Sequence, residues 1–545
     1  MRLNLRIRSR ASPRPFHVFS GGNSSLSLPR SINTGGTPWT KTKRDLHPNT
    51  PQSFKPKFNP HAYTSGHWLL NNHEQHSLRH IEFDFSALCL KIQALCPENG
   101  PIVSCEKLEG GNNRVFVFAL DDGRRVVARL PFRTAGRTDV LVRSEVAMGE
   151  FLQSKTQTPV PKIMDWSDDV ANPIGAEYII MECVSGVQLH QAWRDMSGVQ
   201  QLKCIRSIYK VLKPVVELSF PAYGSIYFTG DVEASVARDL DDRFAIGPHC
   251  SARYYWEAGV MSSDRGGSGR GNRGPWVDFN AFCDGLVDAG LSRLPSPDLP
   301  VRKRPSFYGS VQDHIELLSH ARRVLHAMAA DPRIKQCVAP TLFHPDLHKR
   351  NIFVSREDPT VITGIIDWQA ASIEPAFWYA DEVPDFATTR DEHLCHQAFD
   401  AITQLQLPKI GQPRSMNANL FRPFRYTHNT WANGAVALRH DLIQTAQYWN
   451  AMGFVGTCPY ATPTAEELAT HQEEYEYFKT VFQLERMLME GLNVPSDGWV
   501  PPEAWELTQQ VHRELFDEFV RAVLDDPDDH INSEEEARIV WPYDI

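Results

Sequence analysis

The sequence contains no hydrophobic run long enough to span a bilayer, and its ten cysteines are scattered singly, without a CxxC pair. The first absence argues against a transmembrane helix, which needs about 20 apolar residues. The second argues against zinc ribbons and thioredoxin-type redox motifs, which use paired cysteines. Cys183 and Cys204 lie in apolar sequence, and we interpret them as buried thiols of a protein from a reducing compartment.

Acidic residues are absent from positions 1–44, which contain nine lysines or arginines. A basic, serine-rich start without acids is typical of an organelle transit peptide, although a basic tail without a targeting role would have the same composition. The remaining chain carries 47 basic and 66 acidic residues, a formal net charge of −19. Such an acidic body argues against nucleic acid as a partner, because the phosphate backbone attracts basic surfaces.

At 545 residues the chain is too long for one compact core, so we expect at least two lobes. No internal repeat is present. The predicted organisation is a targeting segment and disordered linker (1–75), a small lobe (76–183), a large lobe (184–525) with a Gly/Ser-rich insert near 262–275, and an acidic tail (526–545).

The small lobe is predicted to be an antiparallel sheet with one helix. Alternating and β-branched runs predict strands at 101–108, 114–120, 124–130 and 177–184, and a helix at 138–154. The large lobe is predicted to be mostly helical. It contains two short strands, at 351–354 and 361–366, and helical patterns at 199–218, 311–330, 392–406, 430–450, 465–490 and 502–524. The fold class is therefore α+β.

Gly110 and Gly111 stand in the turn "EGGNN" between the first two strands. Glycines there allow a ligand to approach the backbone closely, or allow a positive φ. A hairpin turn without a ligand would use the same residues, so this motif is weak by itself.

Glu145 shares one face of its predicted helix with Leu141, Met148 and Leu152, because these positions are spaced 4, 3 and 4 apart. A carboxylate on a buried face needs a partner, and Arg129 in the preceding strand can supply one. The pair is either a purely structural ion pair or a means of holding a cation toward an anionic ligand.

"FHPDLHKRNIFV" (343–354) crowds polar side chains into a loop before a short strand. Asp346 could accept a proton from a substrate hydroxyl, and the amide oxygen of Asn351 could bind a metal ion. Asp367 ends the strand "VITGII", where a carboxylate is well placed for Mg²⁺. Each acid taken singly could be a turn or cap residue, but phosphoryl transfer explains the whole set in this order.

The histidines of the loop have plainer interpretations. His344 is more simply structural than catalytic, and His348, Lys349 and Arg350 are expected to face solvent. A metal-dependent hydrolase using His344, Asp346 and His348 is disfavoured, since no second His/Asp cluster supplies further ligands.

"HPDLHKRN" matches the H-x-D-x-x-x-x-N catalytic loop of protein-kinase-like enzymes, and "IIDW" stands where those enzymes have D-F-G. The combination resembles the aminoglycoside phosphotransferase and choline kinase-like family over residues 100–385. The basic start, "VVARLP", "SEVAMGEFL" and "EYIIMECV" resemble a fungal mitochondrial subgroup, altered inheritance of mitochondria protein nine. The resemblance implies a two-lobed protein-kinase-like fold and a mitochondrial location.

The resemblance also implies roles for residues. Asp346 would be the catalytic base, Asn351 and Asp367 would bind Mg²⁺, and Glu145 would pair with the strand cation. Met181 to Val184, including Cys183, would form the hinge that meets the adenine of ATP. The sequence departs from the family at Arg129, where a lysine normally contacts the α- and β-phosphates.

We therefore predict ATP- and Mg²⁺-dependent phosphorylation of a small-molecule hydroxyl. The alternative is a non-catalytic kinase-like protein that binds nucleotide or a partner and supports mitochondrial maintenance or inheritance. The acceptor would be selected by residues 220–310 and 385–490. The acids Asp381, Glu382 and Asp385 would suit a cationic acceptor.

Overall fold

The computed structural model describes residues 54–255, 271–295, 303–388, 393–525 and 531–545. Two sequence predictions therefore lie outside it. They are the targeting segment, up to residue 53, and most of the predicted insert at 262–275.

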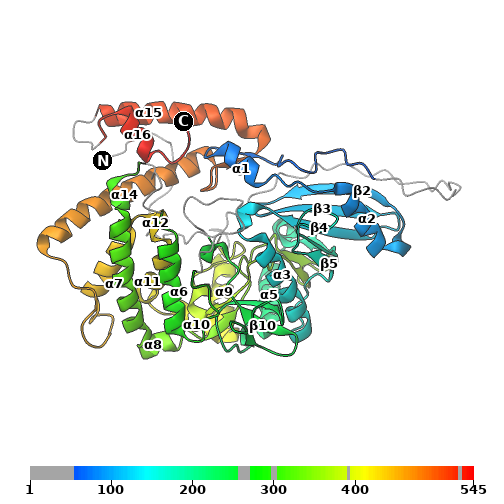
Figure 1. Ribbon diagram of the computed structural model, residues 1–545, viewed down its shortest axis with the longest axis horizontal. Coiled ribbons are helices and arrows are strands. Elements are labelled where there is room, and N and C mark those ends of the chain that lie inside the picture. The colour runs from blue at the N-terminus through cyan, green and yellow to red at the C-terminus, as the bar shows by residue number, and fades with distance from the viewer. Residues whose placement is uncertain (1–53, 256–270, 296–302, 389–392, 526–530) are drawn as a thin grey trace.

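The small lobe is a five-stranded antiparallel sheet, shown at the right of Figure 1. Its spatial order is β2 (Ile102–Glu109), β3 (Asn113–Leu120), β4 (Arg125–Pro131), β6 (Tyr178–Glu182) and β5 (Ile163–Ser167). Alternate residues face opposite sides, as strand geometry requires. Ile180 packs with the core under α2 (Phe85–Leu95), and its neighbour Ile179 packs against α3 (Thr138–Lys155).

The large lobe is mostly helical. Its helices are α4 (Leu189–Ala192), α5 (Gly198–Glu217), α6 (Phe279–Ser292), α7 (Val311–Ala329), α8 (Pro332–Lys335), α9 (His393–Gln406), α10 (Pro408–Arg414), α11 (Arg422–Tyr426), α12 (Thr430–Asn433) and α13 (Ala435–Gln447). The single helix predicted at 430–450 is two helices, α12 and α13. They are separated at Gly434, whose φ of 90° interrupts the helical backbone.

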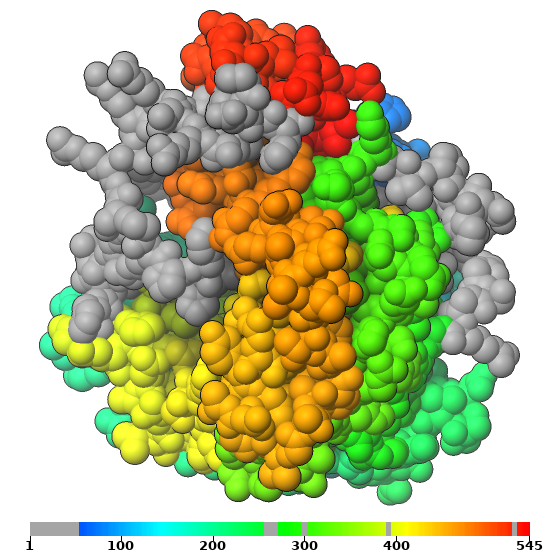
Figure 2. Space-filling model, turned by 90° about the vertical axis from the view of Figure 1, so that its left-hand side faces the viewer, coloured from blue at the N-terminus to red at the C-terminus, as the bar shows by residue number. Residues whose placement is uncertain are grey.

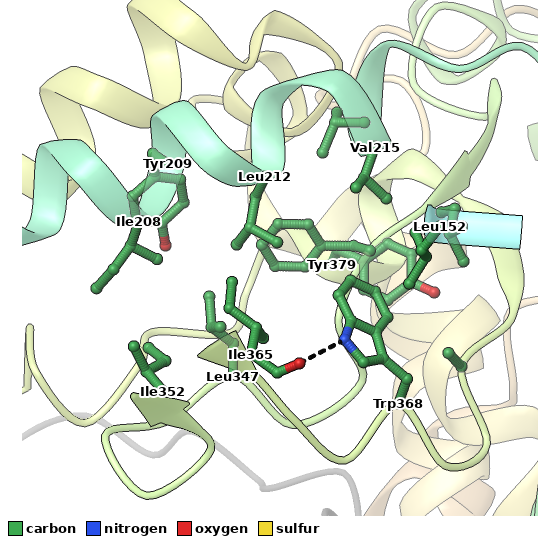
Figure 3. Packing of buried hydrophobic residues seen from close by; sticks show 14 of the residues in the cluster. Leu152, Ile208, Tyr209, Leu212, Val215, Leu347, Ile352, Ile365, Trp368 and Tyr379 are labelled. Carbon is green, nitrogen blue, oxygen red and sulfur yellow. Dashed lines mark hydrogen bonds between the residues drawn. The ribbon is translucent and has the colours of Figure 1, made fainter. Parts of the chain in front are cut away.

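Three small antiparallel sheets connect these helices to the site. They are β11 (Pro340–Leu342) with β14 (Ile373–Pro375); β13 (Ile362–Ile365), β12 (Ile352–Val354) and β7 (Val187–Gln188); and β8 (Ser225–Phe228), β10 (Phe244–Gly247) and β9 (Arg238–Asp239). Helix α5 lies over β12 and β13, where Leu212 and Ile365 pack in one apolar core (Figure 3). Trp368 belongs to this core, and its indole N–H donates to the Ile365 carbonyl at 3.1 Å.

The structure differs from the predicted organisation at both ends of the chain. Residues 54–75 are not a free linker, because β1 (His67–Trp68) pairs with β15 (Trp499–Val500) and α1 (Asn72–Leu78) follows. The acidic tail also packs: Trp541 is buried against α15 (Trp505–Leu524), next to α16 (Glu534–Val540). In both segments, aromatic side chains are buried in a hydrophobic cluster. Their neighbours in the sequence are mostly polar, so the sequence contained no sign of this burial.

Helices α14 (Ala465–Leu492), α15 and α16 form a C-terminal layer along the top of Figure 1. Phe478 of α14 packs with Phe307 and Val436 of the large lobe. Figure 2 shows the orange part of the chain, which includes α14, in the middle of one face, with the red C-terminal helices above it. None of the helices in the described ranges is long and apolar enough to cross a membrane.

Candidate active site

His344 anchors the loop between β11 and β12. Its side chain is fully buried, and Nε2 donates to the Ile366 carbonyl at 2.9 Å. Nδ1 accepts from the backbone N–H of Asp346 at 3.1 Å. Burial lowers the pKa of the imidazole, so the ring is neutral with its proton on Nε2. His344 therefore has a structural role: its hydrogen bonds fix the backbone position of Asp346.

Asn351 lies at the other end of the same loop. Its side-chain Nδ2 donates to the backbone carbonyl of Asp346 at 3.0 Å, and its backbone carbonyl accepts from the Ile366 N–H at 2.9 Å. Because Ile352 pairs with Ile365, the β12–β13 hairpin brings Asn351 beside the chain that leads into Asp367. The loop and the strand-end acid therefore meet at one end of the hairpin.

Asp367 has an unusual backbone for a residue with a side chain, with φ at 65°. Such left-handed conformations cost free energy outside glycine and persist where the surroundings impose them. Here Trp368 is held in the core below, and Arg129 holds the carboxylate, with Nη1 3.1 Å from Oδ1. The backbone strain turns the carboxylate toward the small lobe.

Arg129 lies between two carboxylates. Its Nη2 forms an ion pair with Glu145 of α3, while Nη1 reaches Asp367. The side chains of Arg129 and Glu145 are each 9% exposed. Burial lowers the pKa of the guanidinium and Asp367 opposes that shift. The helix spacing correctly predicted that Glu145 would pair with Arg129, but it gave no sign of the second pair, with Asp367.

The glycine turn does not adopt a positive φ, which was one of the two alternatives predicted for it. Gly110 N–H donates to the Asn113 carbonyl at 3.0 Å, and neither Gly110 nor Gly111 has a positive φ. A Cβ added at Gly110 would lie 3.9 Å from the Asn113 carbonyl oxygen, an ordinary van der Waals contact, so the turn does not exclude a side chain there. The turn is tied down instead: Thr134 Oγ1 donates to the Gly111 carbonyl at 3.0 Å.

A pair of amide side chains joins the glycine turn to the large lobe. Asn113 Nδ2 donates to Gln369 Oε1 at 2.8 Å, and Gln369 Nε2 donates back to Asn113 Oδ1 at 3.2 Å. Gln369 is two residues after Asp367. This contact was missed from the sequence, since nothing in a motif links residues 256 positions apart.

The predicted hinge begins at the end of β6. Met181 pairs with Val127 and Ile163, and Cys183 N–H donates to the Arg125 carbonyl at 3.4 Å. Gly186 follows with φ at 101°, and a Cβ there would lie 2.1 Å from the Val354 carbonyl. A glycine is therefore required where the chain passes from the five-stranded sheet into β7, which pairs with β12, and the hinge segment thus lies between the two lobes.

The contact of His348 with Asp346 is the second contact that sequence reasoning missed. It was expected to face solvent, but its side chain is only 14% exposed and Nε2 lies 3.2 Å from Asp346 Oδ2. The sequence contained one signal, a histidine two residues after the acid, and that spacing by itself does not distinguish a contact from a solvated side chain.

Two of the acids proposed for a cationic acceptor already have partners. Asp381 pairs with Arg425, and Asp385 accepts from the backbone N–H of Lys349 at 2.9 Å. The Glu382 side chain is exposed. Desolvation by the surrounding protein, and next the charge of the Asp346 carboxylate, raise the pKa of its carboxyl to about 7.

The arrangement gathers an accessible carboxylate, two further oxygen donors and a buried cation from separate parts of the chain. In chemical terms it can orient a hydroxyl, hold a hard divalent cation and neutralise a phosphate. Within the described ranges, no group of three or more His, Cys, Asp or Glu side chains could hold a metal ion without other ligands.

Two known proteins are similar to this chain over most of its length. A subtelomeric hrmA-associated cluster protein of Aspergillus fumigatus is 27% identical over 495 residues, covering 79% of this chain and 94% of the relative. Altered inheritance of mitochondria protein 9, mitochondrial, of Yarrowia lipolytica is 22% identical over 537 residues, covering 86% and 88%. The relatives named as mitochondrial proteins support the predicted mitochondrial localisation.

A solved aminoglycoside phosphotransferase, in ternary complex with AMP-PNP and hygromycin B, is 13% identical with a TM-score of 0.35, covering 66% of this chain and 97% of that chain. Residues 104–378, about half of the chain, match the phosphotransferase enzyme family and include Arg129, Asp346 and Asp367, while Asp381, Glu382 and Asp385 lie just beyond the matched range. As its loop motif predicted, the chain belongs to the phosphotransferase enzyme family.

Proposed function

We propose that this protein uses ATP and Mg²⁺ to phosphorylate a hydroxyl group of a small molecule in mitochondria. One observation carries the proposal: Asp346, Asn351 and Asp367 are joined through the β12–β13 hairpin, and Asp367 contacts Arg129 of the small lobe. Phosphoryl transfer depends mainly on positioning and charge neutralisation, which is what this set can supply.

The residues present fit a magnesium ion. The Nδ2 of Asn351 donates to the Asp346 carbonyl, which leaves Oδ1 available as a ligand. Arg129 contacts Oδ1 of Asp367, which leaves Oδ2. Mg²⁺ usually takes one or two such protein oxygens together with phosphate oxygens and water. When bound, the ion would neutralise charge on the transferring phosphate.

The chain's own groups have separate tasks in this proposal. Asp346 would accept a hydrogen bond from the acceptor hydroxyl and take its proton as the hydroxyl oxygen bonds to the γ-phosphorus of ATP. The bond from that phosphorus to the β,γ-bridging oxygen would break in the same step, and ADP would leave. Arg129, held by Glu145, would place a fixed positive charge beside the phosphates. The hinge at Met181 to Val184 would meet the adenine, and the turn at Gly110 and Gly111 would cover the phosphates.

A second candidate function is a kinase-like protein that binds nucleotide or a partner without turnover and supports mitochondrial maintenance or inheritance. Arg129 favours it. A guanidinium has a planar fork of donors and differs from the compact ammonium of lysine. Its contacts with both Glu145 and Asp367 also compete with any ligand for the same charge.

Binding of Mg·ATP tests the first step. A ligand that binds the folded state at 100 times its Kd adds about 2.7 kcal/mol to the free energy of unfolding. We expect urea unfolding to show this gain with Mg·ATP and a smaller one with ATP and EDTA. A free energy of unfolding that Mg·ATP leaves unchanged would refute both nucleotide-dependent functions.

The acceptor requires a screen. Alcohols and amino-alcohols should be tested for acceleration of ATP consumption by the wild-type protein, with phosphorylated product identified by mass spectrometry. An acceptor that raises consumption and appears as its phosphate ester supports the enzyme. Tight Mg·ATP binding with no transfer to any acceptor or to water would favour the non-catalytic candidate.

A further inference from the structure

The carboxylate of Asp346 is held by a residue that the proposed chemistry does not yet use. His348 Nε2 lies 3.2 Å from Asp346 Oδ2, within hydrogen-bond reach. Asp346 itself is 38% exposed, so its carboxylate can meet both this ring and a bound molecule. The contact restrains one oxygen of the carboxylate, Oδ2.

The His348 ring is fixed in orientation and in tautomer. Its Nδ1 accepts from the backbone N–H of Arg350 at 3.2 Å. A nitrogen that accepts a hydrogen bond carries no proton, so in the neutral ring the proton is on Nε2, the atom facing Asp346. The Nε2 proton therefore faces the carboxylate, with Nε2 3.2 Å from Oδ2, and the ring cannot turn without losing the contact with Arg350.

The backbone on which His348 stands is fixed as well. Lys349 N–H donates to Asp385 Oδ1 at 2.9 Å, and the Lys349 carbonyl accepts from His190 N–H at 3.1 Å. These bonds come from two other parts of the chain, the segment after β14 and the start of α4. The loop is thus held on both sides of the ring, as a preorganised catalytic group requires.

We propose that His348 is a positioning residue for Asp346: its Nε2–H holds carboxylate Oδ2 and directs Oδ1 to the acceptor hydroxyl. This inference rests on the proposed function, since it assigns His348 a part in the same phosphoryl transfer. His348 touches neither nucleotide nor acceptor in this role. It acts through Asp346, and a carboxylate free to rotate would place its oxygen correctly only part of the time.

Two substitutions separate the hydrogen bond from the packing of the ring. His348→Leu removes the donor and keeps a side chain of similar bulk. His348→Gln offers an amide N–H near the position of Nε2. The matched control is His326→Leu, which removes a similar histidine–aspartate contact between α6 and α7, where Nε2 lies 3.0 Å from Asp284 Oδ1.

The measurement is steady-state Mg·ATP consumption, alongside the stabilisation that Mg·ATP produces. We expect His348→Leu to lower kcat about 10–100-fold with little change in KM for ATP, and His348→Gln to recover most of the loss. Stabilisation by Mg·ATP should stay as in wild type in both variants, and His326→Leu should keep wild-type kcat. Equal losses in the Leu and Gln variants, or none in His348→Leu, would overturn the proposal.

A second readout does not need turnover. Burial lowers the pKa of His348, and the hydrogen bond and charge of Asp346 more than reverse this, so the pKa is raised overall; Asp385 raises it further and Arg350 lowers it. In ¹⁵N-histidine NMR, Asp346→Asn should lower the pKa of His348, and Asp385→Asn should lower it less. If wild type fails to consume ATP, the proposed function fails, while this titration still decides whether Asp346 and His348 interact. An unchanged pKa in Asp346→Asn would refute the contact.

Discussion

At the scale of single residues, the site depends on one buried cation. Arg129 joins strand β4 to helix α3 through Glu145 and reaches the large lobe through Asp367. A buried charge is stable only with a partner, because its transfer from water costs several kcal/mol. The pair therefore fixes the position of α3 as well as the charge offered to a ligand.

Removing one member of this pair should be costly. Glu145→Gln leaves the buried Arg129 with Asp367 as its remaining carboxylate, and we expect the free energy of unfolding to fall by about 3–5 kcal/mol. Urea unfolding measures the loss. Glu490→Gln is the matched control, because Glu490 and Arg486 form an exposed pair on α14 that should contribute under about 1 kcal/mol. Equal effects of the two variants would contradict the buried pair.

The residue scale also shows what a sequence can predict about a site. The spacing of Leu141, Glu145 and Met148 predicted a carboxylate on a buried helix face, and the pairing with Arg129 agrees. The contact of His348 with Asp346 was not predicted, since a ring two residues from an acid can turn either way. Only the backbone bond from Arg350 decides its direction.

At the scale of elements, residues 54–83 form a strap between the small lobe and the C-terminal layer. Glu109 accepts from Thr64 N–H at 2.8 Å, and Arg114 Nη1 donates to the His61 carbonyl at 2.7 Å. Both side chains are fully buried, and they flank the glycine turn. Figure 1 shows the strap and α1 between the sheet and α15. The strap thus ties the turn to the C-terminal layer.

Trp68 is the central side chain of this contact. It is 1% exposed, its Nε1 donates to Asp497 Oδ2 at 3.2 Å, and the Arg79 guanidinium lies 4.2 Å from its ring. We expect Trp68→Ala to lower the free energy of unfolding by about 3–5 kcal/mol, as for other buried aromatics. Leu507→Ala on the exposed face of α15 is the control. A loss below 1 kcal/mol in Trp68→Ala would show that the strap is not docked.

The C-terminal layer should respond to acid. His512 Nε2 accepts from the indole Nε1–H of Trp541 at 2.7 Å. Burial lowers the pKa of this histidine from 6.5 to about 4. The unfolded chain therefore binds the proton more readily than the folded one. Stability falls as pH drops from about 6.5 to 4, and the His512 share is about 2 kcal/mol at pH 5.

His512→Gln tests this linkage, because glutamine can still accept from Trp541 but does not titrate. The difference in unfolding free energy between pH 7.5 and 5 should be smaller in the variant by roughly that amount. His440 and His471, whose pKa values burial also lowers to about 4, keep their share of the slope. An identical slope in variant and wild type would contradict the assignment.

Element prediction succeeded where a periodic pattern is long and failed where pairing is short and distant. The helices predicted at 465–490 and 502–524 are α14 and α15. The strands β1 and β15 have two residues each and lie more than 400 positions apart, so neither has a detectable period. This is why a docked strap was interpreted as a linker.

At the scale of the whole molecule, the lobes are connected on two sides. The hinge after β6 is one connection. The other runs from the glycine turn through the strap to β15 and α14, whose Phe478 packs on the large lobe. The amide pair of Asn113 and Gln369 adds a direct contact beside the site. A fixed angle between the lobes would hold the site residues in place before a ligand arrives.

Mitochondrial import is also a property of the whole chain. Positions 1–44 contain nine basic residues and no acid, and relatives are named as mitochondrial proteins. We expect a fluorescent fusion lacking residues 1–44 to stay in the cytosol, while the full chain co-localises with a mitochondrial marker. Retention of the truncated fusion in mitochondria would contradict an N-terminal import signal.

The central claim is that Asp346 serves phosphoryl transfer, and the rate of Mg·ATP consumption by Asp346→Asn tests it most directly. Asp239→Asn, on the exposed strand β9, is the matched control. We predict that Asp346→Asn retains the stabilisation by Mg·ATP but loses about 10²–10⁴-fold in kcat, while the control keeps wild-type kcat. Equal rates of ATP consumption in wild type and Asp346→Asn would contradict the account.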